Sequence, residues 1–252
     1  MKPTFLNHEK PLYTAMIQKK TLAEVLETID NAKAAGADAV GIQFEKLLPE
    51  YHNKQSYRAI FERAGDTPTY VTNYRRSKIN EAKTDDELAE EMIELCECGA
   101  TLIDVMGDIF CPTEGELTAD PTAIEKQKKL IGRIHAAGGE VLMSSHVLKY
   151  IEADRVMEIA HAHSNRGADI SKIVTGADNQ TQQIDNLRII DLLKQDLPIP
   201  FLFLCGGTCN IVRRIGPLLG CCMWLCVYEH DELSTKSQPE IRKLRAVIDN
   251  FN

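Results

Sequence analysis

The chain has 252 residues, of which 44% are hydrophobic, and its formal net charge is −8. This length suits one large domain with a substantial core, and the negative charge argues against binding to nucleic acid or to an anionic membrane surface. The longest apolar runs, PFLFLCGG and GCCMWLCVY, are too short to span a bilayer, and no secretion signal is visible at the start, so we expect a cytoplasmic protein.

Short apolar segments typical of β-strands alternate with amphipathic helical segments along the chain. The first strand is expected at residues 11–17, and a helix follows at residues 21–36, where Thr21 is a suitable N-cap and Gly36 a suitable stop. The later strands are expected at 37–47, 67–75, 101–107, 140–146, 168–174, 199–207 and 221–228. The later helices are expected at 55–63, 84–98, 121–137, 152–165, 180–194, 210–219 and 238–251.

Eight strand–helix pairs in a chain of this length predict a (β/α)8 barrel that forms a single domain over residues 1–252. Because the strands are almost continuously apolar, we expect them to be buried on both faces, as in a parallel sheet. A doubly wound open sheet is the competing architecture. It is less favoured because no Gly-rich phosphate-binding loop follows an early strand.

One expected strand, ADISKIV at residues 168–174, contains a lysine, Lys172, between apolar neighbours. Burial of an unpaired ammonium group is costly, so such a lysine is paired, reaches out to solvent or takes part in chemistry. A nucleophilic lysine must be neutral, and an apolar setting near other cations lowers the pKa of a lysine. Lys172 is therefore a candidate nucleophile.

Active sites of (β/α)8 barrels lie where the strands end and the helices begin. The residues expected at this end of the barrel include the pair Arg75–Arg76, His146 and Lys172, and we expect Arg75 to point into the mouth. Together they predict a basic pocket in an acidic protein. Such a pocket favours a small anionic substrate, most simply a carboxylate.

The segments GADAVGIQFEKL, TYVTNYR, VLMSSH, GADISKIV, IVRRIG and STKSQ follow one another in an order that resembles type I 3-dehydroquinate dehydratase. The resemblance extends over residues 11–251, and its most specific part is the pair SSH and GADISK, with His146 and Lys172. It implies a lyase of the shikimate pathway of aromatic amino acid biosynthesis. Such an enzyme dehydrates 3-dehydroquinate to 3-dehydroshikimate through a lysine Schiff base, without a metal or organic cofactor.

By this resemblance, Lys172 attacks the ketone of a small keto acid and forms an imine, which helps the neighbouring carbon to lose its proton. His146 acts as general acid and base. The resemblance also implies substrate contacts, by Arg213 and Gln238 with the carboxylate, by Ser234 on a mobile loop that covers the site, and by Arg75 with the hydroxyls.

The second strand departs from the family pattern. The family carries a glutamate and an arginine spaced as ExR, whereas this chain has Gly41 and Gln43 there, followed by Glu45. We expect Gln43 and Glu45 to supply substrate contacts instead. Because Gly41 and Gln43 are smaller and less charged, the sequence also predicts a wider mouth on this side.

The third strand lacks the glutamate that orients the catalytic histidine in the family. Four residues after Arg75 the chain has Ile79, which leaves Asn80 and Glu81 as candidates for contacting His146. Two alternatives to the dehydratase remain open: a Schiff-base aldolase or dehydratase that acts on a different small keto acid, and a non-catalytic barrel that binds a metabolite. The eight cysteines show no zinc-ligand spacing, so no metal is expected. The resemblance allows a homodimer.

Overall fold

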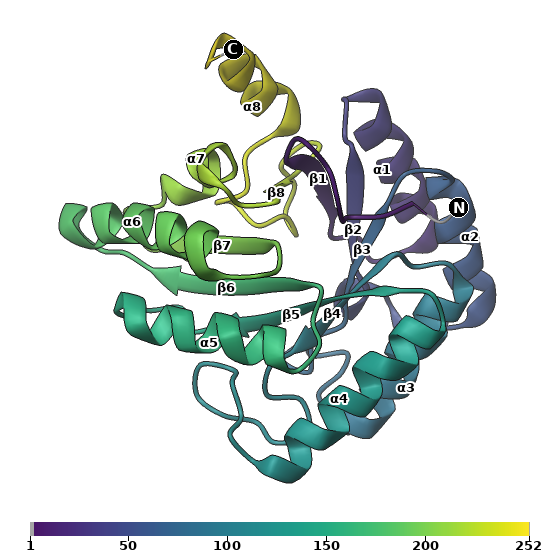
Figure 1. The fold of residues 1–252 in the computed structure, drawn as a ribbon. Helices are drawn as coiled ribbons and strands as arrows, with labels where there is room; N and C mark the ends of the chain where they lie inside the picture. The colour runs from purple at the N-terminus through teal and green to yellow at the C-terminus, as the bar shows by residue number, and fades with distance from the viewer. Residues whose placement is uncertain (1–2, 252) are drawn as a thin grey trace.

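The computed structural model describes residues 3–251, and in it eight parallel strands form a nearly closed barrel with helices on its outer side (Figure 1). The strands are β1 (Leu12–Ile17), β2 (Ala39–Gln43), β3 (Thr69–Thr72), β4 (Leu102–Met106), β5 (Glu140–His146), β6 (Ile170–Gly176), β7 (Phe201–Gly206) and β8 (Met223–Cys226). The α-helices are α1 (Leu22–Ala34), α2 (Lys54–Ala64), α3 (Asp85–Cys98), α4 (Pro121–Ala136), α5 (Ala153–Asn165), α6 (Gln180–Asp196), α7 (Val212–Leu219) and α8 (Ile241–Ile248).

The strand order β7-β6-β5-β4-β3-β2-β1-β8 follows the chain around the barrel, and every adjacent pair in this order is parallel. At the seam between β7 and β8, the backbone amide of Cys222 donates a hydrogen bond to the carbonyl of Phe201 at 2.9 Å. This topology confirms the expected (β/α)8 barrel and excludes the open doubly wound sheet. None of the helices within residues 3–251 has the length and hydropathy needed to cross a membrane.

The helices begin at residues that satisfy their free backbone amides. Thr21 and Thr84 each form a capping box with the glutamate three residues later, at the start of α1 and α3. Asn53, Asp120 and Asn179 accept a hydrogen bond from the third residue of the helix that each one precedes. The chain therefore carries a local signal for a helix start after most of its strands.

The early ends of β2 and β3 shape the mouth of the barrel. β2 ends at Gln43 and continues as a 3-10 turn over Phe44–Lys46, which contains the buried Glu45. β3 ends at Thr72 rather than at residue 75, so the polar residues after it lie in a loop. Both ends bring side chains inward from loops rather than from regular strand positions.

The sheet register places Lys172 inside the barrel. Lys172 lies beside Ser144 of β5, and both Lys172 and Val174 line the central cavity, as expected for residues two apart on a strand. Ile173, between them, packs instead in an apolar cluster with residues of the surrounding helices. The lysine therefore occupies an inward position in an otherwise apolar strand.

Candidate active site

A cavity of about 290 Å³ opens at the carboxyl ends of the strands. It contains six of the eight residues that the sequence suggested, namely Lys172, His146, Arg213, Gln238, Gln43 and Glu45. Its other lining residues are Met16, Gln18, Lys46, Thr72, Tyr74, Arg76, Leu148, Val174, Leu204, Leu225, Leu233 and Thr235. The two remaining residues, Arg75 and Ser234, lie outside this lining.

The amine of Lys172 is surrounded by three oxygen atoms. Its Nζ lies 2.7 Å from the hydroxyl of Tyr74, 2.9 Å from the hydroxyl of Tyr70 and 3.1 Å from Oδ2 of Asp104. Both tyrosines donate their hydroxyl hydrogen to that same carboxylate oxygen, and Ser144 donates to Oδ1 of Asp104 at 2.5 Å. Asp104 is thus a buried counter-ion with its hydrogen bonds satisfied.

Two opposing effects act on the proton of Lys172. Burial lowers the pKa of its ammonium group, and the neighbouring Asp104 carboxylate works in the opposite direction. Burial has the larger effect, so the pKa of Lys172 is below the ordinary value for a lysine. A lysine with a lowered pKa loses its proton more readily, which is what a nucleophilic amine requires.

His146 stands at the end of β5 with its imidazole in a defined orientation. Its Nδ1 donates to Oε2 of Glu116 at 2.6 Å, and its backbone amide donates to the same oxygen at 3.2 Å. A carboxylate can only accept, so Nδ1 carries the ring proton and Nε2 keeps its lone pair. Burial and the nearby cations Lys172, Arg76 and Arg213 hold the pKa of His146 well below its usual value. The ring is therefore neutral and able to act as a base.

Glu116 replaces the residues that the sequence suggested as partners of His146. It belongs to the loop between β4 and α4, and its backbone has a φ of 53°, in the left-handed region. Asn80 is instead buried against the loop after β3, where its Nδ2 donates to Oδ1 of Asn73 and to the carbonyl of Tyr74. The expectation that Asn80 or Glu81 contacts His146 is thus wrong, because a different loop reaches the imidazole.

The two adjacent arginines face opposite ways, and the expectation that Arg75 points into the mouth is wrong. Arg75 forms a bidentate pair with Asp85 at 2.9 and 3.0 Å and a further bond to Asp108 at 2.9 Å, which ties the loop after β3 to two other segments. Arg76 lines the cavity, stacks 4.3 Å above the ring of Tyr74 and pairs with Glu116. The inward position of Tyr74 is the physical reason, because its neighbour Arg75 must then turn outward.

Arg213 and Gln238 lie in the cavity with unused hydrogen-bonding capacity. Nε of Arg213 donates to the carbonyl of Cys205 at 2.9 Å, and no carboxylate within residues 3–251 forms an ion pair with its guanidinium group. Burial lowers the pKa of Arg213. Oε1 of Gln238 is buried without a hydrogen-bond partner in the described part of the chain. Both groups are therefore open to a polar ligand.

Gln43 and Glu45 line the cavity from the end of β2. Glu45 is 5% exposed, and the two oxygen atoms of its carboxyl group accept from the hydroxyl of Thr72 at 2.9 and 3.1 Å. Burial raises the pKa of Glu45 to about 7, because hydrogen bonds from its own backbone amide and Thr72 and the charge of Lys46 offset only part of the lost hydration. Near neutral pH this side chain is thus partly protonated and is able to donate as well as accept a hydrogen bond.

Gly41 does not widen the mouth. A Cβ atom at this position would lie 2.3 Å from Sδ of Met16 and 3.2 Å from Cδ1 of Tyr70, so these two side chains occupy the space that a larger residue would need. The sequence predicted a wider mouth on this side, and that prediction is wrong. The neighbouring side chains fill the space, which also brings the Tyr70 hydroxyl to Lys172.

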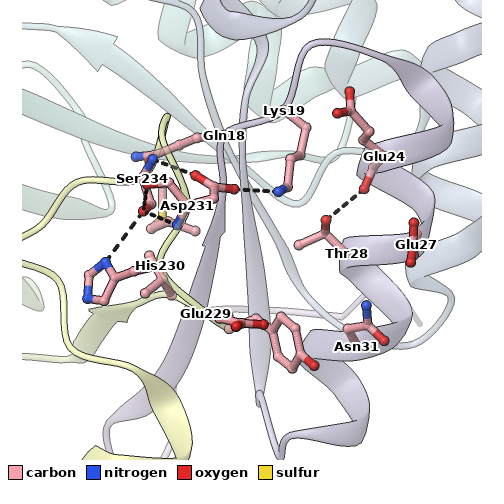
Figure 2. A pocket seen from close by; sticks show the side chains of 13 residues that line it. Gln18, Lys19, Glu24, Glu27, Thr28, Asn31, Glu229, His230, Asp231 and Ser234 are labelled. Atoms are coloured by element: carbon pink, nitrogen blue, oxygen red, sulfur yellow. Dashed lines mark hydrogen bonds and ion pairs between the residues drawn. The ribbon is translucent and has the colours of Figure 1, made fainter.

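Ser234 lies beside a second, more acidic pocket rather than in the central cavity (Figure 2). Its hydroxyl accepts from the amide of Asp231 and contacts Nδ1 of His230, and Lys19 pairs with Asp231 from the end of β1. The next residue, Thr235, does line the central cavity and exchanges two hydrogen bonds with the side chain of Gln18. In this arrangement Thr235 occupies the position expected of Ser234.

Sequence reasoning missed Tyr74, Glu116 and Thr235 as residues of the site. Tyr74 had a detectable signal, because it follows Tyr70 and Thr72 at the two-residue spacing that shares one face of a strand. Glu116 had none, since its contact with His146 depends on the path of a long loop. Thr235 differs by a single position from the expected Ser234.

Comparisons with known proteins agree with this geometry. The family model described as type I 3-dehydroquinase matches residues 13–251. No curated protein matches the chain.

Solved structures share the fold at low sequence identity. The 3-dehydroquinate dehydratase of Geobacillus kaustophilus has a TM-score of 0.80 at 16% identity, with 96% of this chain and 91% of that chain covered. The type I 3-dehydroquinate dehydratase of Clostridium difficile, with covalently modified comenic acid, has a TM-score of 0.81 at 14% identity. The match covers 100% of this chain and 98% of that chain. The 3-dehydroquinate dehydratase of Enterococcus faecalis has a TM-score of 0.79 at 17% identity, with 100% of both chains covered. The family match spans almost the whole chain, and the chain therefore belongs to the type I 3-dehydroquinase family, whose members are carbon–oxygen lyases.

Proposed function

We propose that this protein dehydrates 3-dehydroquinate to 3-dehydroshikimate through a Schiff base on Lys172. The observation that supports it best is one cavity that holds an amine of lowered pKa, a neutral imidazole with a free nitrogen, and an arginine that has no carboxylate partner among residues 3–251. These are the three groups needed to form an imine, to move a proton and to bind a carboxylate.

The residues divide the reaction between them. Lys172 condenses with the ketone, and the protonated imine accepts electron density when the adjacent carbon loses its proton. Nε2 of His146 takes that proton and returns a proton to the departing hydroxyl, which leaves as water. Glu116 keeps Nε2 available throughout by binding Nδ1.

The remaining polar groups of the cavity bind the substrate. Arg213 and Gln238 hold the carboxylate, while Gln43 and Glu45 contact hydroxyl groups from the end of β2. Arg76 and Thr235 take the parts first expected of Arg75 and Ser234, because they are the members of each pair that line the cavity. The filled space beside Gly41 favours this substrate over a larger keto acid.

Chemical trapping tests the proposal. Treatment with sodium borohydride in the presence of 3-dehydroquinate should give one reduced adduct on the peptide that contains Lys172, as measured by mass spectrometry. Lys172→Met should give neither adduct nor turnover. His146→Ala should still form the adduct but should lose turnover by about 10²–10⁴-fold, the usual contribution of a general acid–base. Wild-type protein without an adduct and without turnover would exclude this substrate.

Assembly as a homodimer and a cytoplasmic location remain predictions from the sequence. Size-exclusion chromatography with light scattering tests the first, and fractionation of cells tests the second. The proposed chemistry needs neither, because all the residues assigned to it belong to one cavity in one chain.

A further inference from the structure

The amine of Lys172 has no free lone pair in the hydrogen-bond arrangement of the resting site. Tyr70 and Tyr74 each give their only hydroxyl hydrogen to Asp104, so each accepts a hydrogen from Lys172. Asp104 accepts a third hydrogen from Nζ at 3.1 Å. Three acceptors around one nitrogen match an ammonium group, which must lose a proton before it attacks a carbonyl.

Among these three partners, Tyr74 alone also reaches the substrate space. Tyr74 lines the cavity together with Lys172 and His146, whereas Tyr70 and Asp104 do not. The Tyr74 hydroxyl lies 2.7 Å from Nζ of Lys172 and 2.6 Å from Oδ2 of Asp104, so it bridges the Lys172 nitrogen and the Asp104 carboxylate. The Arg76 guanidinium stacks on one face of the Tyr74 ring, and the His146 ring meets it edge to face at 5.3 Å between centroids.

We propose that Tyr74 is a catalytic residue that carries protons between Lys172, Asp104 and the carbonyl oxygen during imine formation and hydrolysis. This inference rests on the proposed Schiff-base function and assigns to Tyr74 the steps at the nitrogen. It leaves to His146 the proton transfers at the carbon and at the departing hydroxyl of the substrate.

The first half of the sequence forms the carbon–nitrogen bond. An N–H bond of the ammonium group breaks and its proton passes to the Tyr74 oxygen, while the hydroxyl proton of Tyr74 passes to Asp104. The neutral amine then attacks the carbonyl carbon, and the carbonyl electron pair moves to oxygen. The oxygen of Tyr74 takes a proton from the Lys172 nitrogen, which is now bonded to the substrate carbon, and the hydroxyl proton of Tyr74 passes to the former carbonyl oxygen. The product is a neutral carbinolamine.

The second half expels water and restores the carboxylate. Protonated Asp104 returns its proton to Tyr74, and Tyr74 passes its hydroxyl proton to the carbinolamine oxygen. The carbon–oxygen bond breaks, water leaves, and the nitrogen lone pair forms the protonated imine. One ammonium group and one ketone have become one iminium group and one water, and Asp104 is again ionised.

Two matched tyrosine variants test this assignment. Tyr74→Phe and Tyr70→Phe each remove one hydroxyl that binds both Nζ and Asp104, and only the first removes a group that lines the cavity. In single-turnover experiments stopped with borohydride at timed intervals, Tyr74→Phe should slow adduct formation with 3-dehydroquinate by about 100-fold. Tyr70→Phe should slow it by less than about tenfold, the cost of one hydrogen bond.

Rescue by small acids separates proton transfer from simple positioning. When imidazole or formate is added at constant pH, the rate of adduct formation by Tyr74→Phe should increase with the concentration of the added buffer. The rate of adduct formation by Tyr70→Phe should stay unchanged. Equal losses in the two variants, or a Tyr74→Phe rate that does not respond to buffer, would overturn the assignment. Thermal unfolding of both variants checks that each is folded.

A second carbonyl probe distinguishes failure of this inference from failure of the proposed substrate. Pyruvate carries only a ketone and a carboxylate, and the same pair of variants should show the same difference with it. Wild-type adducts with pyruvate but not with 3-dehydroquinate would reject the substrate, and the ratio between the two variants would still decide the role of Tyr74. Absence of a Lys172 adduct with either probe would reject both proposals.

Discussion

The two walls of the cavity differ in how their polar groups are paired. On the wall formed by the ends of β3 to β6, Lys172 meets Asp104 and His146 meets Glu116 at hydrogen-bonding distance. On the wall formed by the other strand ends, Arg213 lacks a carboxylate partner within residues 3–251 and Gln238 has an unpartnered oxygen. In the described part of the chain, the carboxyl group of Glu45 accepts hydrogen bonds only from the Thr72 hydroxyl and its own backbone amide.

This difference indicates a division of labour. The paired wall fixes its reactive atoms before any substrate arrives, so little rearrangement is needed at the moment of reaction. The unpaired wall has hydrogen-bonding groups left for a ligand, and a ligand that satisfies them gains binding free energy. Three predictions, from the largest expected effect to the smallest, test this contrast.

The largest effect is expected from Glu45, the buried acid of the unpaired wall. Above pH 4.5 the unfolded chain ionises this group, while the folded protein holds it protonated up to about pH 7. The unfolded state then binds fewer protons, so stability falls as pH rises through this window, by about 3 kcal/mol in total. Glu45→Gln should remove this loss, and urea unfolding at pH 4.5 and pH 8 measures it.

The comparison of the two pH values gives a clear criterion. Glu45→Gln should match the wild type at pH 4.5 and exceed its stability at pH 8. The exposed Glu62 of α2 supplies the control, because Glu62→Gln should leave the pH dependence unchanged. A Glu45→Gln protein that is no more stable than wild type at pH 8 would mean that the carboxyl group is compensated in solution.

The second effect concerns Arg213, which we place at the substrate carboxylate. Arg213→Ala should raise KM by about 10–100-fold, since a hydrogen bond to a charged group contributes about 1.5–3 kcal/mol. Steady-state kinetics measures this change. The adjacent Arg214 is exposed and bonds to Asn210, so Arg214→Ala is the matched control and should change KM little. Equal effects of the two variants would contradict a specific anion site at Arg213.

The smallest effect is expected on the paired wall, at the positioning residue Glu116. Glu116→Gln keeps a hydrogen-bond acceptor for Nδ1 but removes the negative charge, which lowers the pKa of His146 further and weakens it as a base. Turnover should fall by about tenfold, a typical loss for a modest decrease in basicity. The pH at which activity is half-maximal on the acid side should also move down.

Glu114 provides the control for this loop. It is exposed and pairs with Lys149, so Glu114→Gln should leave both the rate and the pH profile as in the wild type. If both variants lose activity equally, the effect comes from the loop as a whole. A wild-type pH profile in Glu116→Gln would show that Glu116 does not act through His146.

Most of the fold was predictable because its signals are local. The strand and helix segments follow from apolar periodicity, and the Thr21 and Thr84 capping boxes fix two helix starts within four residues of sequence. The errors lie at the strand ends. β2 and β3 stop earlier than their composition suggests, because the chain turns there to place Glu45 and Tyr74 against the cavity.

The candidate site was predictable where it depends on strand register, and unpredictable where it depends on loops. Lys172 and His146 occupy their expected strand positions and line one cavity. The side chain of Arg75 could not be oriented from composition, because its partners Asp85 and Asp108 belong to other segments of the chain. Ser234 and Thr235 lie in a loop whose hydrogen bonds to Gln18 join residues 217 positions apart.

The sequence by itself determined the barrel and the inward lysine, since two-residue and helical periodicities are properties of neighbouring residues. Only the tertiary structure decided which groups surround that lysine and its histidine. Tyr74 follows β3 and Asp104 lies on β4, 98 and 68 residues away from Lys172 along the chain. Glu116 lies 30 residues from His146 on a loop with a left-handed backbone. Such contacts form only when closure of the barrel brings distant segments together, so no local pattern contains them.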